Sequence, residues 1–435
     1  SFGGVTNTDV DAGAVRVGVV VAVATETGAA EIKPYDATFP CNDKLIGAWG
    51  FSSVDAAEGA NSPFDYDGHG SHTASTAAGN FVEATISGGA RAPETIDLSG
   101  VAPHANIIAY AGCCTGSALT AAIDQAIADG VDVINYSIGS PSPSDVWNDF
   151  DTVGYLAARE AGIFVATSAG NDGPGDATLG SPADAPWLTA TAASTHSRTW
   201  ANDVTFTGGD SALATINGNG FTDGYGPAPV VYAGDFGDAL CLAPFPAGTW
   251  TSGEIVICDR GQIARVDKSA NAAAGGAGGS ILANDVDNGL SINADAHSIP
   301  TSHITYPDGI LLKAWVATGT GHMGTISAGV YVQDPARGDI MAGFTSRGPN
   351  RAIDIVSPSV SAPGVDILAA HGQNDAIVWD FSSGTSMASP HVAGAGALLM
   401  QEHPTWTPAE IQSALMLTAN TAMLDSDEVT PAGPF

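Results

Sequence analysis

Three apolar segments decide the fold class of this sequence: NIIAYA at 106–111, VDVINYSI at 131–138 and IFVAT at 163–167. Each segment is short and contains β-branched or aromatic residues, which is typical of strands. Short, largely apolar strands are typical of parallel sheets that are buried on both faces. The segments therefore predict the central strands of a parallel sheet.

Helical patterns connect these strands. Residues 117–129 follow the first strand, with Ser117 expected as the N-cap and Gly130 expected to end the helix. Residues 151–161 follow the second strand and stop at Gly162. Strands that alternate with helices predict an α/β fold, in which helices cover both faces of a parallel sheet.

The pattern changes in the middle of the chain. Residues 205–335 are rich in Gly, Ala, Thr and Val, and they predict many short strands joined by turns. We interpret residues 228–320 as an inserted, mostly β second domain. The first domain is then divided into two parts, at 1–227 and 321–435.

Two further helices are predicted near the end of the sequence. The small residues of 386–399 indicate a closely packed helix. Thr407 and Glu410 form a capping box with a proline at the first helical position, so another helix is expected to run to about Ala419.

The charge balance limits the partners of the protein. The chain of 435 residues carries 13 Lys and Arg against 46 Asp and Glu, a formal net charge of −33. Nucleic acids and anionic membranes bind basic patches, so neither is expected as a partner. High net charge keeps a protein soluble and also fits a saline habitat. No apolar run reaches the roughly 18 residues that a membrane span needs.

The cysteines predict a disulfide rather than a zinc site, because none has the C-x-x-C spacing of a zinc ligand pair. Cys241 and Cys258 flank one short segment and are able to bridge it. The adjacent Cys113 and Cys114 are poorly placed to bond to each other. With Cys41, the total is five, so one thiol is left over or has its partner outside this sequence.

The segment GTSMASPH at 384–391 contains the first candidate site residue. A Gly-Thr turn precedes Ser386, which opens a helix. Backbone N–H groups at a helix N-terminus point outward and favour developing negative charge beside the Ser386 hydroxyl. The alternative is that Ser386 is an ordinary N-cap. His391 falls within the helix and is expected to be a packed core histidine.

The segment DGHGSHT at 67–73 contains the second candidate. Glycines on both sides of His69 allow backbone or substrate to approach it closely. His69 and His72 have the spacing of a metal pair on one helix face. No further ligands are spaced to complete such a site, so no metal is predicted.

The segment Ser168–Asn171 contains the third candidate and directly follows a predicted strand. Ligands of α/β sheets bind at the carboxyl ends of the strands. The side-chain N–H of Asn171 is therefore able to face an oxyanion. The alternative is that Asn171 is an ordinary turn residue.

Together these segments resemble the motifs of the subtilisin-type serine peptidases (subtilases). His69–His72 is similar to the histidine motif, Ser168–Asn171 to the oxyanion motif and Gly384–Pro390 to the serine motif, in the family's order. The resemblance covers about residues 40–420, and its serine motif is highly specific. It implies a subtilisin-like sheet and a secreted or extracytoplasmic endopeptidase. Such a protein acts on polypeptides, requires no cofactor and is expected to be a monomer, and no calcium site is indicated here.

The insert resembles a protease-associated (PA) domain, which many larger subtilases carry between the Asn and Ser motifs. The likeness lies in Gly253–Gly261 and Ala264–Lys268. The segment FTSRGPN at 344–350 is similar to the one that follows the PA domain in those members. The basic side chains of the insert are expected to be solvated or paired within it: Arg260, Arg265 and Lys268.

The resemblance also implies the roles of the candidates. Ser386 is the expected nucleophile, His69 its general base, and Asn171 an oxyanion donor together with the Ser386 backbone N–H. The walls of the substrate groove are expected from two segments: Ser137, Ile138 and Gly139, and Ser168, Ala169 and Gly170.

The acid of the triad is the main departure from the family, whose Asp-Thr/Ser-Gly turn is absent from this sequence. In one interpretation Val17–Val23 is the strand before that turn, and Glu26 is the acid. In the other, Ser1-Phe2 lies just after the missing turn, and the acid precedes Ser1. No other cysteine lies near Cys41 in the sequence, which favours the second interpretation. A non-catalytic, peptide-binding relative of the same fold is the alternative function.

Overall fold

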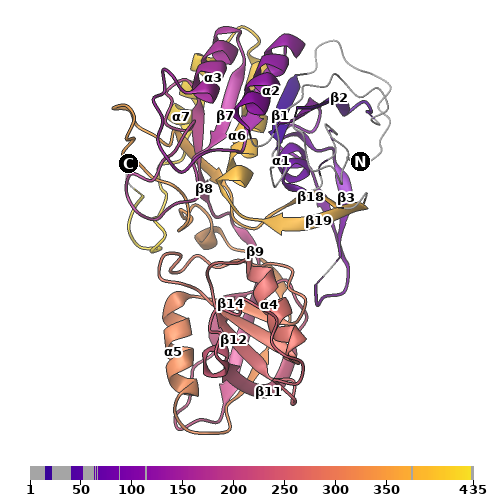
Figure 1. The fold of residues 1–435 in the computed structure, drawn as a ribbon, viewed down its shortest axis with the longest axis vertical. Coiled ribbons are helices and arrows are strands. Elements are labelled where there is room, and N and C mark those ends of the chain that lie inside the picture. The colour runs from indigo at the N-terminus through magenta and orange to yellow at the C-terminus, as the bar shows by residue number, and fades with distance from the viewer. Residues whose placement is uncertain are drawn as a thin grey trace.

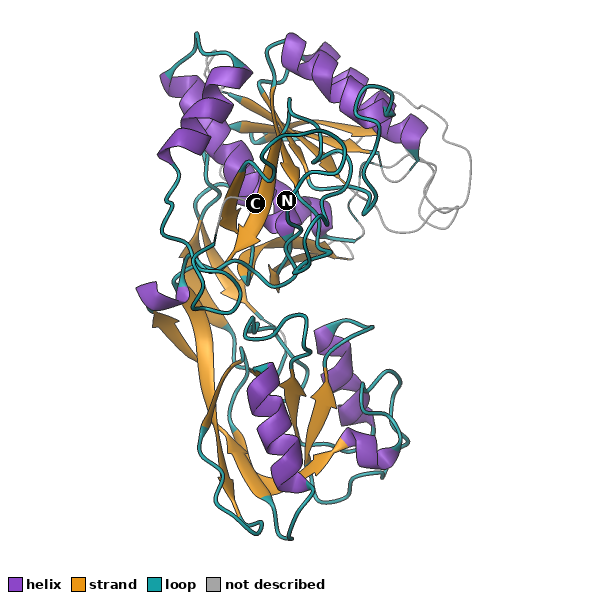
Figure 2. Ribbon diagram, turned by 90° about the vertical axis from the view of Figure 1, so that its left-hand side faces the viewer, coloured by secondary structure: helices purple, strands orange, loops and turns teal. Residues whose placement is uncertain are grey.

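The structure is a computed structural model that describes residues 15–21, 41–51, 63, 65, 67–87, 89–112, 115–373 and 376–432. Figure 1 shows two units, one above the other, and Figure 2 shows the same arrangement from the side. The upper unit contains the first and last parts of the chain. The lower unit contains the middle part.

The upper unit is built on a parallel sheet of seven strands, counted over the described residues. The apolar segments quoted above supply β5, β6 and β7. Of these, β6 and β7 are neighbours, and β1 lies between β5 and β6. The order is β17 (Val360–Pro363), β8 (Thr189–Ser194), β7 (Phe164–Ser168), β6 (Val133–Tyr136), β1 (Arg16–Val21), β5 (Asn106–Ala111) and β2 (Leu45–Gly50).

Helices cover both faces of this sheet, as predicted. One face packs against α1 (His69–Ala78) and α6 (Thr385–Glu402) in a core that includes Val17 and Val19 of β1. The other face packs against α2 (Gly116–Asp129) and α3 (Phe150–Glu160). The α/β prediction is therefore confirmed.

The helix boundaries agree with the sequence except at one cap. Thr115, not Ser117, is the N-cap of α2, because its hydroxyl accepts the backbone N–H of Ala118. Gly130 ends that helix in a left-handed conformation, with φ of 62°. The predicted capping box is present at the start of α7 (Pro408–Thr418).

The lower unit is built on a mixed sheet of eight strands within the described part of the chain. It begins with β9 and ends with β16, so it extends beyond the predicted range 228–320 on both sides. The order is β10 (Ile216–Asn219), β14 (Thr301–Ile304), β13 (Gly279–Ala283), β12 (Ile255–Asp259), β11 (Tyr225–Tyr232), β15 (Met323–Ile326), β9 (Arg198–Thr207) and β16 (Val330–Gln333).

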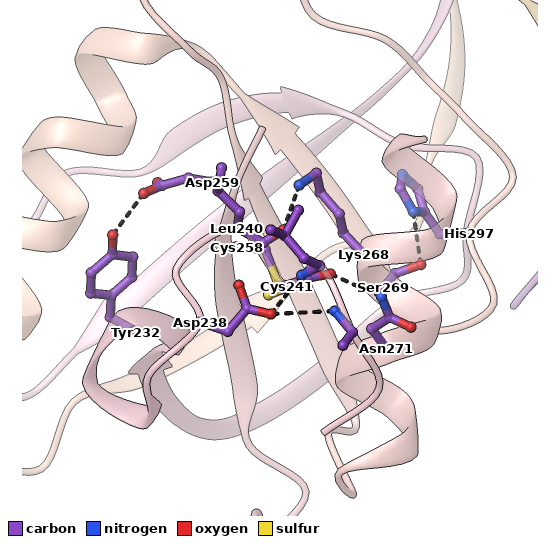
Figure 3. The surroundings of a disulfide bond; sticks show 12 residues. Tyr232, Asp238, Leu240, Cys241, Cys258, Asp259, Lys268, Ser269, Asn271 and His297 are labelled. Carbon is purple, nitrogen blue, oxygen red and sulfur yellow. Dashed lines mark hydrogen bonds between the residues drawn. A yellow bond between two sulfur atoms is a disulfide. The ribbon is translucent and has the colours of Figure 1, made fainter. Parts of the chain in front are cut away.

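Two helices, α4 (Arg265–Ala274) and α5 (Tyr306–Val316), belong to the lower unit. Figure 3 shows the predicted disulfide there, which joins Cys241 to Cys258 of β12. The basic side chains of this unit are paired within it, as expected. Their partners are Asn284 for Arg260, Asp295 for Arg265 and the Leu240 carbonyl for Lys268.

Two hairpins complete the upper unit beside the junction. One consists of β18 (Ile367–Gln373) and β19 (Ala376–Ser382), and it leads directly into α6. The other consists of β3 (Val82–Ile86) and β4 (Glu94–Leu98). Among the described residues, no helix combines the length and the apolar character that crossing a membrane requires.

Candidate active site

Every site residue predicted from the sequence lines one cavity of about 430 Å³ at the carboxyl edge of the parallel sheet. The strands β6 and β7 are neighbours, and each ends at this edge. The first helical turns of α1 and α6 meet there as well. The predicted residues that line the cavity are His69, Ser137, Ile138, Gly139, Ser168, Ala169, Gly170, Asn171 and Ser386.

Ser386 lies in the first turn of α6 and is half-buried. The N-cap of the helix is Gly384, and no side chain caps it, so Ser386 is not the N-cap. Its hydroxyl donates to the Ser137 carbonyl at 3.3 Å, while the Ser137 hydroxyl donates to the Ser386 carbonyl at 2.8 Å. These two bonds fix the serine turn against the end of β6.

Asn171 is oriented by the residue next to Ser386. Its Oδ1 accepts the backbone N–H of Thr385 at 2.9 Å and the Thr385 hydroxyl at 3.0 Å. The oxygen of the amide is therefore occupied, and the Nδ2 group is the part left to donate into the cavity. Asn171 itself is exposed. An amide N–H directed at a cavity is able to donate to a group bound there.

His69 is the first residue of α1, and the chain approaches it through a tight turn. Gly68 has φ of 89°, and a Cβ there would lie 2.1 Å from the His371 ring. Asp65 stabilises the turn, because its carboxylate accepts the backbone N–H groups of Gly68 at 2.9 Å and Ser71 at 2.5 Å. The glycine before His69 is thus required by backbone conformation and by a close neighbour.

The surroundings of His69 favour its neutral form. Burial lowers its pKa below the ordinary value for histidine. The carboxylates of Asp67 and Asp65 oppose this shift, and the His371 ring adds to it. A neutral imidazole is the form that is able to accept a proton.

The Nδ1 atom of His69 is buried and has no hydrogen-bond partner among the residues that the structure describes. In a triad this atom faces the acid. Glu26, the acid in one interpretation of the sequence, lies outside the described residues, and so does Ser1. The described residues therefore place His69 and Ser386 at one cavity but supply no hydrogen-bond partner for Nδ1.

The two other motif histidines do not line this cavity. His72 is fully buried, and its Nε2 lies 2.9 Å from the Ile367 carbonyl, which ties α1 to the β18–β19 hairpin. Burial lowers its pKa to about 3. His391 bonds to the Met387 carbonyl at 2.8 Å through Nδ1 and is half-buried within α6. Both are structural residues, and no cluster that could hold a metal ion occurs within the described ranges.

The walls of the cavity are kept close by backbone contacts. The Ser140 N–H donates to the Ser181 carbonyl at 2.8 Å, and a Cβ at Gly139 would lie 2.8 Å from that same carbonyl oxygen. On the other wall Gly170 has φ of 106°, and a Cβ there would lie 2.7 Å from the Ser346 hydroxyl. Glycines are therefore required at both walls.

Sequence reasoning missed the residues that hold the site residues in place. Thr385 bonds to Asn171 itself, while Asp65 and Ser346 bond to sequence neighbours of the predicted residues. A carboxylate shortly before a helix start is a recognisable capping signal, so Asp65 could have been found. The bonds of Thr385 and Ser346 join segments that are far apart in the chain and leave no local pattern.

The comparisons with known proteins show the family of the chain. Residues 45–432 match the model of the Subtilase family (Peptidase S8). The chain is 37% identical to "Subtilisin-like protease SBT1.7" and 38% identical to "Subtilisin-like protease SBT1.4", both of Arabidopsis thaliana. Each match covers 91% of this chain, and the two cover 56% and 54% of those proteins, so the chain spans about half their length.

A solved structure is also similar over most of the chain. It is the psychrophilic subtilisin-like protease Apa1 from the Antarctic psychrotroph Pseudoalteromonas sp. AS-11. The match covers 96% of this chain and 92% of that one, with 16% identity and a TM-score of 0.42.

Proposed function

The chain belongs to the subtilase family, and we propose that it is a serine endopeptidase whose nucleophile is Ser386. One observation carries the proposal: His69, Asn171 and Ser386 come from three distant segments and line a single cavity. The coincidence of a hydroxyl, an imidazole and an amide at one cavity is the arrangement that acyl transfer by a serine requires.

The proposed reaction is the hydrolysis of a peptide bond. The neutral His69 imidazole takes the Ser386 proton while Ser386 Oγ attacks the scissile carbonyl carbon. The Nδ2 group of Asn171 and the Ser386 backbone N–H donate to the oxyanion that forms. His69 then gives its proton to the leaving amine, and water releases the acyl group by the same steps in reverse. No cofactor takes part in these steps.

The substrate in this proposal is an extended polypeptide. Segments Ser137–Gly139 and Ser168–Gly170 both line the cavity, and we expect backbone at its rim to pair with such a chain as an added strand. We place the protein in a secreted or extracytoplasmic compartment. The Cys241–Cys258 disulfide supports this placement, because such bonds persist in oxidising surroundings.

The acid that orients His69 has two proposed sources, Glu26 and a residue upstream of Ser1. The position of β1 supports the first. This strand lies in the interior of the sheet, packs against α1 and ends at Val21, on the same edge as β6. The described end of β1 thus lies at the edge of the sheet where His69 lines the cavity.

A non-catalytic peptide-binding protein is the second candidate function. The observation in its favour is the buried Nδ1 atom of His69, which has no partner within the described part of the chain. Without an acid to fix the imidazole, a related triad loses about four orders of magnitude in rate. Such a protein would bind peptides in the groove and not cleave them.

Labelling with a sulfonyl fluoride or an organophosphate tests the proposal. In the full-length protein we expect stoichiometric labelling of Ser386, together with cleavage of a chromogenic peptide. The Glu26→Gln variant separates the two sources of the acid: a loss of about 10⁴-fold assigns Glu26, and an unchanged rate assigns an upstream residue. Peptide binding with neither labelling nor cleavage would establish the second candidate instead.

A further inference from the structure

We propose that Asn293 of the lower unit is a positioning residue for the nucleophile, through the hydroxyl of Ser383. This inference rests on the proposed function. Ser383 precedes Gly384, the N-cap of α6, and therefore begins the turn that carries Ser386. Asn293 belongs to the segment between β13 and β14, so it links the second sheet to this turn.

Three groups close a ring of hydrogen bonds at the start of the turn. The Asn293 Nδ2 group donates to Ser383 Oγ at 2.9 Å and to Asp366 Oδ1 at 3.0 Å. Ser383 Oγ also accepts the Asp366 backbone N–H at 2.9 Å and donates to Asp366 Oδ1 at 3.3 Å. The Asn293 side chain thus bonds to both ends of the β18–β19 hairpin, at the residue before β18 and the residue after β19.

The lower unit holds Asn293 rigidly. Its side chain is 1% exposed, and its backbone N–H donates to His303 Nδ1 at 2.9 Å. Burial, together with the charges of Arg260 and Arg265, keeps the pKa of His303 well below its ordinary value, so this nitrogen remains an acceptor.

The same segment is anchored to the rest of the lower unit and to Asp366. Asp295 pairs with Arg265 of α4 at 2.5 Å. The Ala294 N–H donates to Asp366 Oδ2 at 2.8 Å. A buried, hydrogen-bonded segment of this kind helps to fix the position of the residues it contacts, because well-packed interiors do not deform freely.

The serine turn therefore has three successive attachments. Ser383 bonds to Asn293, the Gly384 N–H donates to the Gly364 carbonyl at 2.8 Å, and the Thr385 N–H donates to Asn171. Loss of the first attachment leaves the turn held by the upper unit alone. A displacement well below 1 Å at Ser386 is enough to slow the reaction, since positioning errors of about 1 Å cost about 100-fold.

The test measures kcat and KM for a chromogenic peptide in the full-length protein. We expect Asn293→Ala and Ser383→Ala each to lower kcat about tenfold and to leave KM within about twofold. The double variant should lose much less than the product of the two single losses, since both changes break the Asn293–Ser383 bond. Ser383→Thr keeps the hydroxyl and should retain most of kcat.

Asn202→Ala is the matched control. Asn202 is also buried and amide-bonded, but its partners Thr301 and Ser302 lie within the lower unit. If Asn293→Ala and Asn202→Ala have equal kcat for equally folded protein, the positioning role is wrong. Should Asn293→Ala not fold, Ser383→Ala with kcat unchanged overturns the role equally well. If the unmodified protein neither cleaves nor labels, the proposed function fails, and this inference fails with it.

Discussion

Each of the two units has one serine and one histidine that face a common site, and the surroundings of these two sites are opposite. His297 Nδ1 bonds to Ser269 Oγ at 3.0 Å in the lower unit, where both residues are 1% exposed (Figure 3). His69 and Ser386 of the upper unit are half-buried and line an open cavity. A serine beside a histidine therefore does not by itself indicate a catalytic site. Access to a substrate and donors for the oxyanion make the difference.

The polar and charged side chains named for the two units also differ in how they are bonded. In the lower unit, buried charges such as Arg265 and Asp295 satisfy one another. In the upper unit, His69 Nδ1 is buried without a hydrogen-bond partner among the described residues, and the exposed Asn171 lines the same cavity. A buried polar atom without a partner requires an explanation, and for His69 Nδ1 a reaction at this cavity provides one.

Replacement of the two serines should show the largest difference between the units. We expect Ser386→Ala to lower kcat by about six orders of magnitude, the loss known for the nucleophile of subtilisin. Ser269→Ala should leave kcat within about twofold and lower only the stability of the lower unit. Peptide hydrolysis and thermal unfolding of both variants measure this. Comparable activity of the two variants would remove the distinction between the sites.

The internally paired charges of the lower unit predict the second-largest effect, which is on stability. Arg265→Ala leaves the Asp295 carboxylate, whose side chain is 8% exposed, without its partner. We expect a loss of about 3–5 kcal/mol in the free energy of unfolding. Arg16→Ala removes an exposed pair with Asp132 and should cost less than about 1 kcal/mol. Denaturant unfolding distinguishes the two, and equal costs would contradict the description of Arg265 as internally paired.

Asn171→Ala tests the open amide of the upper unit. We expect kcat to fall about 10²- to 10³-fold while KM changes little, because the amide donates only to the developing oxyanion. Asn217→Ala provides a control, since Asn217 is exposed and bonds to Asp203 within the lower unit. A rise in KM with unchanged kcat would assign Asn171 to substrate binding rather than to the oxyanion.

The pH dependence of labelling should show the smallest effect. In a Ser1–Phe435 chain with Glu26→Gln, no proposed acid faces His69, and burial holds its pKa below 6.5. A lowered pKa keeps the imidazole neutral to lower pH, so the labelling rate should fall only as pH drops below 6.5. An acid at Nδ1 favours the charged form of His69, so it should shift the fall in labelling rate to higher pH. If the labelling rate already falls at or above pH 6.5 without the acid, burial does not determine the pKa of His69.

The parts of the fold that local patterns encode were predicted well. The three apolar strands, the capping box at Thr407 and the Cys241–Cys258 disulfide all have short-range signals. The serine motif was specific enough to indicate the family from Gly384–Pro390. The N-cap of α2 was wrong by two positions, because Thr115 and Ser117 both have hydroxyls suited to capping and only the backbone path selects between them.

The contacts that join distant segments could not be predicted. Asn293 and Ser383 meet across the junction of the two units, and neither lies in a recognisable motif. Asp366, which also enters this contact, has a φ of 52° that no local turn pattern indicated. Such contacts depend on the complete fold, and a single sequence contains no local signal for them.

A crystal structure of the protein after reaction with a peptide phosphonate would test the central claim most directly, namely that distant segments converge in one reactive site. We expect phosphorus bonded to Ser386 Oγ, its oxygen facing Asn171 Nδ2, and the His69 ring beside the adduct. An adduct on another residue, or an imidazole at 69 directed away from the bound phosphorus, would contradict the claim.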